Sequence, residues 1–371
     1  MKSILKIEHT NGLWLKPLEW AAVLCVTIAV LWLALPRWHA RRLQIELPKD
    51  FRLSYKLRDD YLLYRSVAAK VVETHPALFI GDSVVWGMYV RNDHTLPAIL
   101  NAKLGGEEIG NLAVDGLHPV VMETLMREYG KAVRDRVVYV YLNPLWMTSP
   151  LYDLSGDGEL VINHPRLLPQ FIGKPPCYHA SLEDRCKAVW ERFIDFEALL
   201  HHVRVAFLDN KDVKNHLAKQ PDKPLHKQLS LNIEPLETGH PSDSKITWED
   251  ASIAEQDWLW VTLDESRQWK SYLATLELLK KRGNTVVAVV GTVNPSMQTA
   301  ASLEKYRALR ADALKRLKDN GYKTVDLPEL PSEEYGDASH PLAAGYERLA
   351  EFMMKKHQLT NHEWTRIDTK F

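Results

Sequence analysis

The stretch ALFIGDSVVWG, residues 77–87, runs from a short apolar segment directly into Gly81, Asp82 and Ser83. An apolar run that ends in a polar turn is typical of a buried strand that stops at the edge of a sheet. The triplet itself is ambiguous, because glycine, aspartate and serine are all common in ordinary turns. Whether Ser83 is a turn residue or a nucleophile therefore depends on the residues at the ends of the other strands.

The rest of the chain alternates between strand-like and helix-like segments. Apolar segments predict strands at 77–80, 107–112, 136–142, 284–290 and 323–327. Amphipathic segments predict helices at 95–105, 119–130, 269–283 and 306–321. Such alternation is typical of a parallel sheet that is covered by helices on both faces. We therefore expect an α/β fold, a flavodoxin-like three-layer sandwich with about five parallel strands.

A long interruption separates the two halves of this pattern, 77–150 and 266–360. It spans 151–265, which is far longer than a typical loop. It holds a helix-like piece at 188–208, AVWERFIDFEALLHHVRVAFL, and a polar run at 211–257. We predict an insertion over one edge of the sheet, and a C-terminal tail at 361–371 after the second half.

The N-terminal region is predicted to contain a membrane anchor. The segment EWAAVLCVTIAVLWLALP, 19–36, has no charge after Glu19 and is nearly as long as the roughly 17–25 residues that cross a hydrocarbon core. No A-x-A-like cleavage site comes after it, which argues against a cleaved signal peptide. We expect one transmembrane helix, preceded by a tail at 1–18 and followed by a juxtamembrane helix at 37–76. A buried helix of a soluble domain is the alternative.

The sequence gives weaker signals about which side of the membrane the C-terminal domain lies on. More basic residues follow the apolar segment than precede it, which favours a cytoplasmic C-terminus, although long domains can cross against this rule. Cys177 and Cys186 are close enough in sequence for a disulfide in an oxidising compartment, but two free thiols fit nearly as well.

Composition and motifs argue against several classes of function. Lys plus Arg total 47 against 48 for Asp plus Glu, so the net charge does not predict nucleic-acid binding. The sequence has neither a P-loop lysine nor a dinucleotide-binding fingerprint, so no nucleotide cofactor is expected. His201 and His202 lack convincing ligand spacing around them, so no metal is predicted.

Residues with candidate functional groups come after most of the predicted strands. Ser83 follows the first strand, Gly116 the second and Asn143 the third, and Asp337 and His340 in DASHP come after the fifth. Because the carboxyl ends of parallel strands meet at one edge of a sheet, we expect these residues to gather there. A serine needs a base such as His340 to take its proton, and a carboxylate such as Asp337 to orient that base. The amides of Ser83 and Gly116 and the side-chain NH2 of Asn143 would stabilise an oxyanion.

These residues lie in four sequence blocks: GDS at 81–83, NLAVDG at 111–116, Asn143, and DASHP at 337–341. In order and spacing, the four blocks resemble those of the SGNH or GDSL hydrolase superfamily. The ending DASHPLAAGY, 337–346, is the most specific part, and the resemblance covers about 77–150 and 266–356. The resemblance implies a catalytic triad and an oxyanion hole, with the residues given above in those roles: Ser83, Asp337 and His340 for the triad, and Ser83, Gly116 and Asn143 for the oxyanion hole.

The region around Asn143 departs from the family pattern. Tyr141 stands where the family usually has glycine, and Pro144 follows Asn143 in place of the usual aspartate. These departures affect the shape of the oxyanion pocket and hence the substrate. We take Tyr141, Trp146 and Asn294 as candidate substrate contacts.

A membrane-anchored chain of this kind resembles the SGNH proteins of envelope acylation, such as alginate-type O-acetylation proteins and the D-alanyl transfer proteins of teichoic acid systems. The resemblance implies a serine esterase or O-acyl(acetyl)transferase that acts on a cell-envelope polysaccharide without a cofactor. It also implies a membrane-bound O-acyltransferase as partner and a domain outside the cytoplasmic membrane of a bacterium. A lipid esterase or lysophospholipase, and a non-catalytic glycan-binding subunit, stay open as alternatives.

Overall fold

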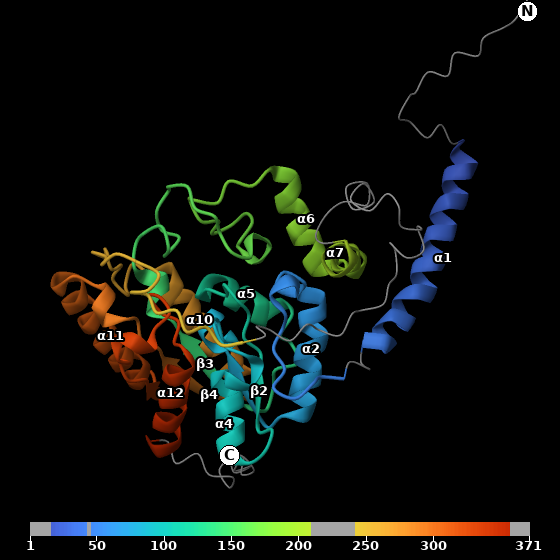
Figure 1. Ribbon diagram of the computed structural model, residues 1–371. Helices are drawn as coiled ribbons and strands as arrows, with labels where there is room; N and C mark the ends of the chain where they lie inside the picture. Colours follow the sequence, from blue (N-terminus) through green and yellow to red (C-terminus); the bar gives the residue numbers. More distant parts are fainter. Residues whose placement is uncertain (1–15, 43–45, 209–241, 357–371) are drawn as a thin grey trace, which may run out of the picture. The chain divides into compact units, whose positions relative to one another are not determined.

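The computed structural model describes residues 16–42, 46–208 and 242–356, and Figure 1 shows its elements. The chain divides into two compact units after residue 45. The first contains α1 (Pro17–Arg42), one helix of 26 residues. Among the described residues, no helix has the length and apolar character that crossing a membrane requires. The helix predicted at 19–36 is present, but its assignment as a membrane span is not supported. The tail at 361–371 and most of the tail at 1–18 lie outside the described residues.

The second unit is built on one sheet of five parallel strands in the order β2-β1-β3-β4-β5. This is the flavodoxin-like order, in which the chain reverses direction across the sheet between β1 and β3. The α/β fold is confirmed, and each strand coincides with a predicted segment or lies within it. The strands are β1 (Ala77–Ile80), β2 (Ile109–Asn111), β3 (Val137–Leu142), β4 (Thr285–Val290) and β5 (Lys323–Asp326).

Helices cover both faces of the sheet (Figure 1). Because successive strand residues point to opposite faces, a doubly covered sheet needs apolar residues at nearly every position, as in the β3 sequence VVYVYL. Phe79, Tyr139 and Val287 face a core that α4 and α12 cover, and α5 packs against α10 on the other side. These helices are α4 (Leu96–Leu104), α5 (Pro119–Glu128), α10 (Arg267–Lys281) and α12 (Ala343–Lys356), and α11 (Ala300–Asp319) lies beside β5.

Helix α2 (Tyr61–Thr74) is part of the α/β domain. Asp60 caps its first turn by accepting a hydrogen bond from Leu63 N at 2.9 Å. Its buried face packs against the sheet, and the Tyr64 hydroxyl donates to Leu112 O at 3.1 Å. The juxtamembrane helix predicted at 37–76 is therefore wrong as one element, since extended residues and a short 3-10 helix at Tyr55–Leu57 precede α2.

The described part of the insertion contains two helices where one was predicted, α6 (Leu182–Phe193) and α7 (Asp195–Phe207). They are separated at Ile194, whose extended backbone (φ −113°, ψ 101°) interrupts the helical pattern. Helix α7 lies against α2, where His202 Nδ1 is 2.5 Å from the Asp60 carboxylate. Cys177 and Cys186 are free thiols in the structure, which is the second of the two alternatives that their spacing left open. Residues 209–241 of the predicted polar run lie outside the described residues.

Candidate active site

Ser83 begins a one-turn helix, α3 (Ser83–Trp86), immediately beyond the end of β1. Asp82 caps this helix by accepting a hydrogen bond from Val84 N at 3.0 Å. Gly81 must be glycine, because a Cβ there would lie 2.5 Å from Val85 Cγ2 and 3.0 Å from Tyr141 Cβ. The tight strand-to-helix turn places the Ser83 hydroxyl at the carboxyl edge of the sheet.

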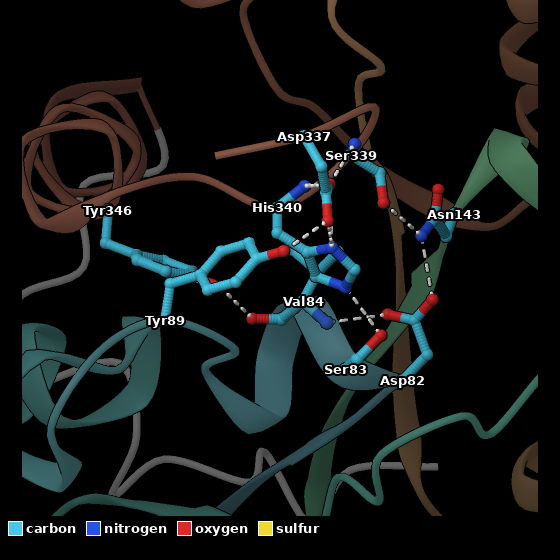
Figure 2. Close-up of polar contacts among 9 residues, drawn as sticks. All are labelled: Asp82, Ser83, Val84, Tyr89, Asn143, Asp337, Ser339, His340 and Tyr346. Carbon is cyan, nitrogen blue, oxygen red and sulfur yellow. Dashed lines mark hydrogen bonds and ion pairs between the residues drawn. The ribbon is translucent and has the colours of Figure 1, made fainter. Parts of the chain in front are cut away.

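The structure brings the predicted triad together (Figure 2). Ser83 Oγ is 2.7 Å from His340 Nε2, although 257 residues separate the two in sequence. On the other side of the imidazole, His340 Nδ1 is 2.7 Å from Asp337 Oδ2 and 2.8 Å from Oδ1. The hydroxyl is therefore placed to donate to the imidazole, and the imidazole to donate to the carboxylate, which is the arrangement that activates a serine nucleophile.

Asp337 is fixed by three further donors. The backbone N–H groups of Ser339 and His340 each donate to Oδ1 at 3.0 Å, and the Tyr89 hydroxyl donates to Oδ2 at 2.9 Å. Tyr89 has a left-handed backbone (φ 70°), and Gly336 lies so close to its ring that a Cβ would be 2.6 Å from Tyr89 Cδ2. Tyr89 was not predicted from the sequence, because nothing local marks a tyrosine in a loop as a partner of a distant carboxylate.

The charges in the site act on each other. Burial alone would raise the pKa of Asp337, but the His340 charge and the hydrogen bonds from His340 and Ser339 lower it to about 2. Burial would lower the pKa of His340, but Asp337, with Asp82 and Asp115 adding to its field, raises it above the ordinary value of 6.5. Asp337 therefore stays ionised at neutral pH and favours the imidazolium that forms when Ser83 loses its proton.

Three candidate oxyanion donors lie at the same edge. Within the described part of the chain, neither Ser83 N–H nor Gly116 N–H donates a hydrogen bond to a protein acceptor. Gly116 has a φ of +73°, a conformation that other residues rarely adopt. Asn143 Nδ2 donates to Asp82 Oδ2 at 2.8 Å and to Ser339 Oγ at 3.3 Å, and Leu145 N donates to Asn143 Oδ1 at 3.0 Å, which sets the orientation of the amide.

Asp82, the residue before Ser83, holds the Asn143 amide. Its carboxyl group is buried, and the second acceptor oxygen, Oδ2, also takes a hydrogen bond from Trp146 Nε1 at 2.9 Å. Burial raises the pKa of Asp82, while donors such as Asn143 and Trp146 act in the opposite direction. No local pattern marked Asp82 as more than a turn residue. Trp146 is partly exposed, so its predicted contact with a substrate stays a hypothesis. Its indole N–H is already bonded to Asp82.

Two predicted substrate contacts are buried and do not offer a surface to a substrate. Tyr141 is 2 % exposed, and its ring fills the space beside Gly291, where a Cβ would lie 2.1 Å from the hydroxyl. Tyr141 thus belongs to the core, and Gly291 makes room for it. Asn294 is 0 % exposed, but its backbone N–H donates to Ala338 O at 2.8 Å and so supports the loop between Asp337 and His340.

The histidine pair of the insertion has protein partners. His201 Nε2 is 3.1 Å from Asp59 O, and burial lowers the pKa of His201 to about 4. In the described ranges, no group of three or more His, Cys, Asp or Glu side chains is arranged to hold a metal ion.

No protein-family model and no curated protein matches this chain. A solved carbohydrate acetylesterase family member from Sinorhizobium meliloti aligns at 11 % identity over 76 % of this chain and 96 % of its own, with a TM-score of 0.31. An acetyl xylan esterase, Est2A, from the rumen bacterium Butyrivibrio proteoclasticus aligns at 11 % identity over 79 % of this chain and 65 % of its own, with a TM-score of 0.36.

A family two carbohydrate esterase from Clostridium thermocellum, solved with cellohexaose, aligns at 11 % identity over 77 % of this chain and 65 % of its own, with a TM-score of 0.29. The chain thus spans about two thirds of the length of the latter two proteins. At TM-scores this low, the three similarities carry no argument about the activity of this chain.

Proposed function

We propose that this chain is an SGNH-type serine esterase or O-acyltransferase that acts on an acylated polysaccharide of the cell envelope through an acyl-Ser83 intermediate. The observation that carries the proposal is the 2.7 Å contact of Ser83 Oγ with His340 Nε2, on an imidazole whose other nitrogen faces Asp337. Three candidate oxyanion donors lie beside it. The polysaccharide substrate is supported by the resemblance of the sequence to envelope-acylation proteins.

The first half of the reaction would form the acyl-enzyme. Ser83 Oγ attacks the ester carbonyl carbon while His340 Nε2 takes the hydroxyl proton, and the amides of Ser83 and Gly116 stabilise the negative charge on the carbonyl oxygen. Asn143 would join them by turning one N–H from its long 3.3 Å contact with Ser339 Oγ to the oxyanion. The tetrahedral intermediate then breaks its bond to the alcohol oxygen, which leaves with the proton from His340. Asp337 stays ionised and holds the imidazole in place.

The second half decides between hydrolase and transferase. Water or an acceptor hydroxyl attacks the acyl carbon, and His340 again takes the proton and returns it to Ser83 Oγ. Attack by water gives a carboxylic acid, and attack by the hydroxyl of an acceptor sugar gives a new ester. Measuring acid release with and without an added polysaccharide distinguishes the two, since a transferase would move acyl groups to the polysaccharide at the expense of acid.

The test is acetate release from p-nitrophenyl acetate by the full chain, compared with Ser83→Ala and His340→Ala. We expect both variants to lose several orders of magnitude in kcat, and by similar factors, because members of a triad act as a unit. A fluorophosphonate probe should label the wild type and not Ser83→Ala. Equal and negligible activity of all three proteins, with no labelling, would contradict the proposal and favour a non-catalytic glycan-binding subunit.

The location and the partner are separate proposals. We propose that the domain works outside the cytoplasmic membrane of a bacterium, beside a membrane-bound O-acyltransferase, and the support is the resemblance of the sequence to envelope-acylation proteins. A reporter fused after residue 371 tests the location. A cytoplasmic signal would overturn it and would leave the serine chemistry unaffected.

A further inference from the structure

The loop between β2 and α5 carries Gly116 and is called the oxyanion loop. The insertion reaches this loop through His164. This residue is 2 % exposed, and its Nε2 is 2.7 Å from the backbone oxygen of Asp115. A carbonyl oxygen can only accept, so Nε2 carries the hydrogen and donates it. The bond joins the insertion to the residue immediately before Gly116.

The accepting oxygen belongs to the same peptide unit as the Gly116 N–H. A peptide unit is planar, and in the trans form its C=O and N–H point in opposite directions. The described residues contain no cis peptide bond. Fixing the direction of the Asp115 carbonyl therefore fixes the direction of the Gly116 N–H on the other side of the plane.

We propose that His164 is a positioning residue, which holds the Asp115–Gly116 peptide so that the Gly116 N–H faces the oxyanion. The inference rests on the proposed function, because it gives a role to an oxyanion donor. Glycine has unusual conformational freedom, and Gly116 lies in the left-handed region, so the bond from His164 limits the orientations that this peptide can take. Pre-organised donors are effective because they need no reorganisation during the reaction.

The other ring nitrogen of His164, Nδ1, also has protein partners. Its Nδ1 is 3.0 Å from Asp59 Oδ1 and 3.2 Å from the Tyr61 hydroxyl, and its ring is 6.0 Å from the Tyr61 ring, centre to centre. These contacts come from Asp59, just before α2, and from Tyr61, the first residue of α2, and they fix the rotation of the imidazole.

The side chain of Asp115 is held as well. Its carboxylate pairs with Arg58 of the segment before α2, so Asp115 is bound at its side chain by one element and at its backbone oxygen by another. The neighbouring Asn163 lies against Gly116, where a Cβ would be 2.9 Å from Asn163 Cγ. The insertion and the segment before α2 thus hold the oxyanion loop between them, and neither is part of the motif blocks in the sequence.

The test compares His164→Leu, which removes the donor, with His164→Gln, whose amide can donate in its place. The control is His202→Leu, which removes another buried histidine bonded to the neighbouring Asp60. We expect His164→Leu to lower kcat for p-nitrophenyl acetate by roughly 10- to 100-fold with KM nearly unchanged, somewhat less than the ~10²- to 10³-fold for complete loss of an oxyanion donor. His164→Gln should recover much of kcat, and His202→Leu should keep it.

A second readout does not depend on activity. Labelling with carbonyl-¹³C aspartate and ¹⁵N glycine selects the amides of Gly116 and Gly158, the two glycines that follow an aspartate in the sequence. In His164→Leu the Gly116 signal should shift or broaden, while Gly158 stays in place. His202→Leu should leave both signals unchanged.

The outcomes separate the two proposals. If the wild type exceeds Ser83→Ala but His164→Leu keeps full kcat and an unchanged Gly116 signal, the role of His164 is overturned and the serine mechanism stands. If the wild type is no more active than Ser83→Ala, the proposed function fails, and the catalytic role of His164 fails with it. In that case a shifted Gly116 signal would still report the constraint on the peptide. Equal losses in kcat for His164→Leu and His202→Leu would also overturn the inference.

Discussion

The hydroxyl of Tyr89 donates a hydrogen bond to Asp337 Oδ2 at 2.9 Å, and so joins the loop after α3 to the loop that carries the triad acid and base. The same tyrosine ring lies edge-on to the His340 imidazole, with 5.8 Å between the ring centres. Tyr89 therefore contacts both Asp337 and His340, the two residues that act on Ser83. In the described part of the chain it has no hydrogen bond to Ser83.

Tyr89→Phe should lower kcat by roughly 100-fold at most, since one hydrogen bond to a charged group contributes about 1.5–3 kcal/mol and each 1.4 kcal/mol is about a factor of ten in rate. Without this donor the Asp337 carboxylate becomes a stronger acceptor for His340, so the pKa of His340 should rise and the acid limb of kcat/KM should move to higher pH. The pH profile of the purified variant checks this. Tyr322→Phe is the control, because that hydroxyl donates to Glu277 on the protein surface. An unshifted profile for Tyr89→Phe would contradict the role.

The pH dependence of the wild type should follow His340. The raised pKa means that the imidazole is protonated, and unable to accept the Ser83 proton, until the pH exceeds a value above 6.5. We therefore expect kcat/KM to rise with pH through that pKa. Asp82→Asn removes one of the carboxylates that raise it, so the midpoint should move to lower pH. A midpoint that stays unchanged or moves to higher pH would contradict this effect of Asp82 on His340.

Stability at acid pH should depend on Asp337. Its pKa is lowered to about 2 in the folded protein, so its contribution to stability is present above the ordinary pKa of 3.8 and is lost as the pH falls towards 2. Asp337→Asn should therefore lose stability relative to the wild type at pH 6, and the difference should shrink at the acid end. Urea unfolding at a series of pH values measures it. A difference that is constant with pH would contradict this linkage.

Asn143→Ala should lower kcat by about 10²- to 10³-fold with little change in KM, as expected for the loss of an oxyanion donor. Trp146→Phe should have a smaller effect in the same direction, because it removes one of the two side-chain donors to Asp82 Oδ2 and leaves Asn143 in place. Steady-state kinetics on p-nitrophenyl acetate measures both. A KM effect alone for Asn143→Ala would place the amide in ground-state binding and not in the oxyanion hole.

Arg52 should be important for stability. It is fully buried, and its guanidinium donates to the carbonyl oxygens of Trp86 at 3.0 Å, Gly87 at 2.5 Å and Val90 at 2.8 Å. Burial lowers its pKa to about 10, so it stays charged at neutral pH. Arg52→Met would remove a charged donor from all three oxygens, although Gly87 O would keep the Val90 N–H at 3.3 Å, and should cost about 2–4 kcal/mol of unfolding free energy, measured by urea denaturation. Arg307→Met, which breaks an exposed pair with Glu329, should cost about 0.5 kcal/mol or less. Similar losses for both variants would contradict this.

Local patterns in the amino-acid chain were enough to predict the strands and the residues at their ends. Alternation of apolar and amphipathic segments is a local property, and a parallel sheet places the ends of its strands at one edge. Ser83, Asn143 and His340 could therefore be expected at one edge, because each comes after a predicted parallel strand. The same local reasoning predicted the helix at the N-terminus, but its assignment as a membrane span is not supported.

The support around these residues exists only in the folded chain. Tyr89 lies in a loop and His164 in the insertion, and each acts on a group that is distant in sequence, so no local pattern marks them. Trp146 was expected to contact a substrate, but its hydrogen bond to the distant Asp82 was not predicted. The burial of Tyr141 depends on the absence of a side chain at Gly291, at the end of the neighbouring strand β4. Hydrogen bonds between distant segments, and the space left by one residue for another, are properties of the packed chain, and they determine which polar groups are held in place around Ser83.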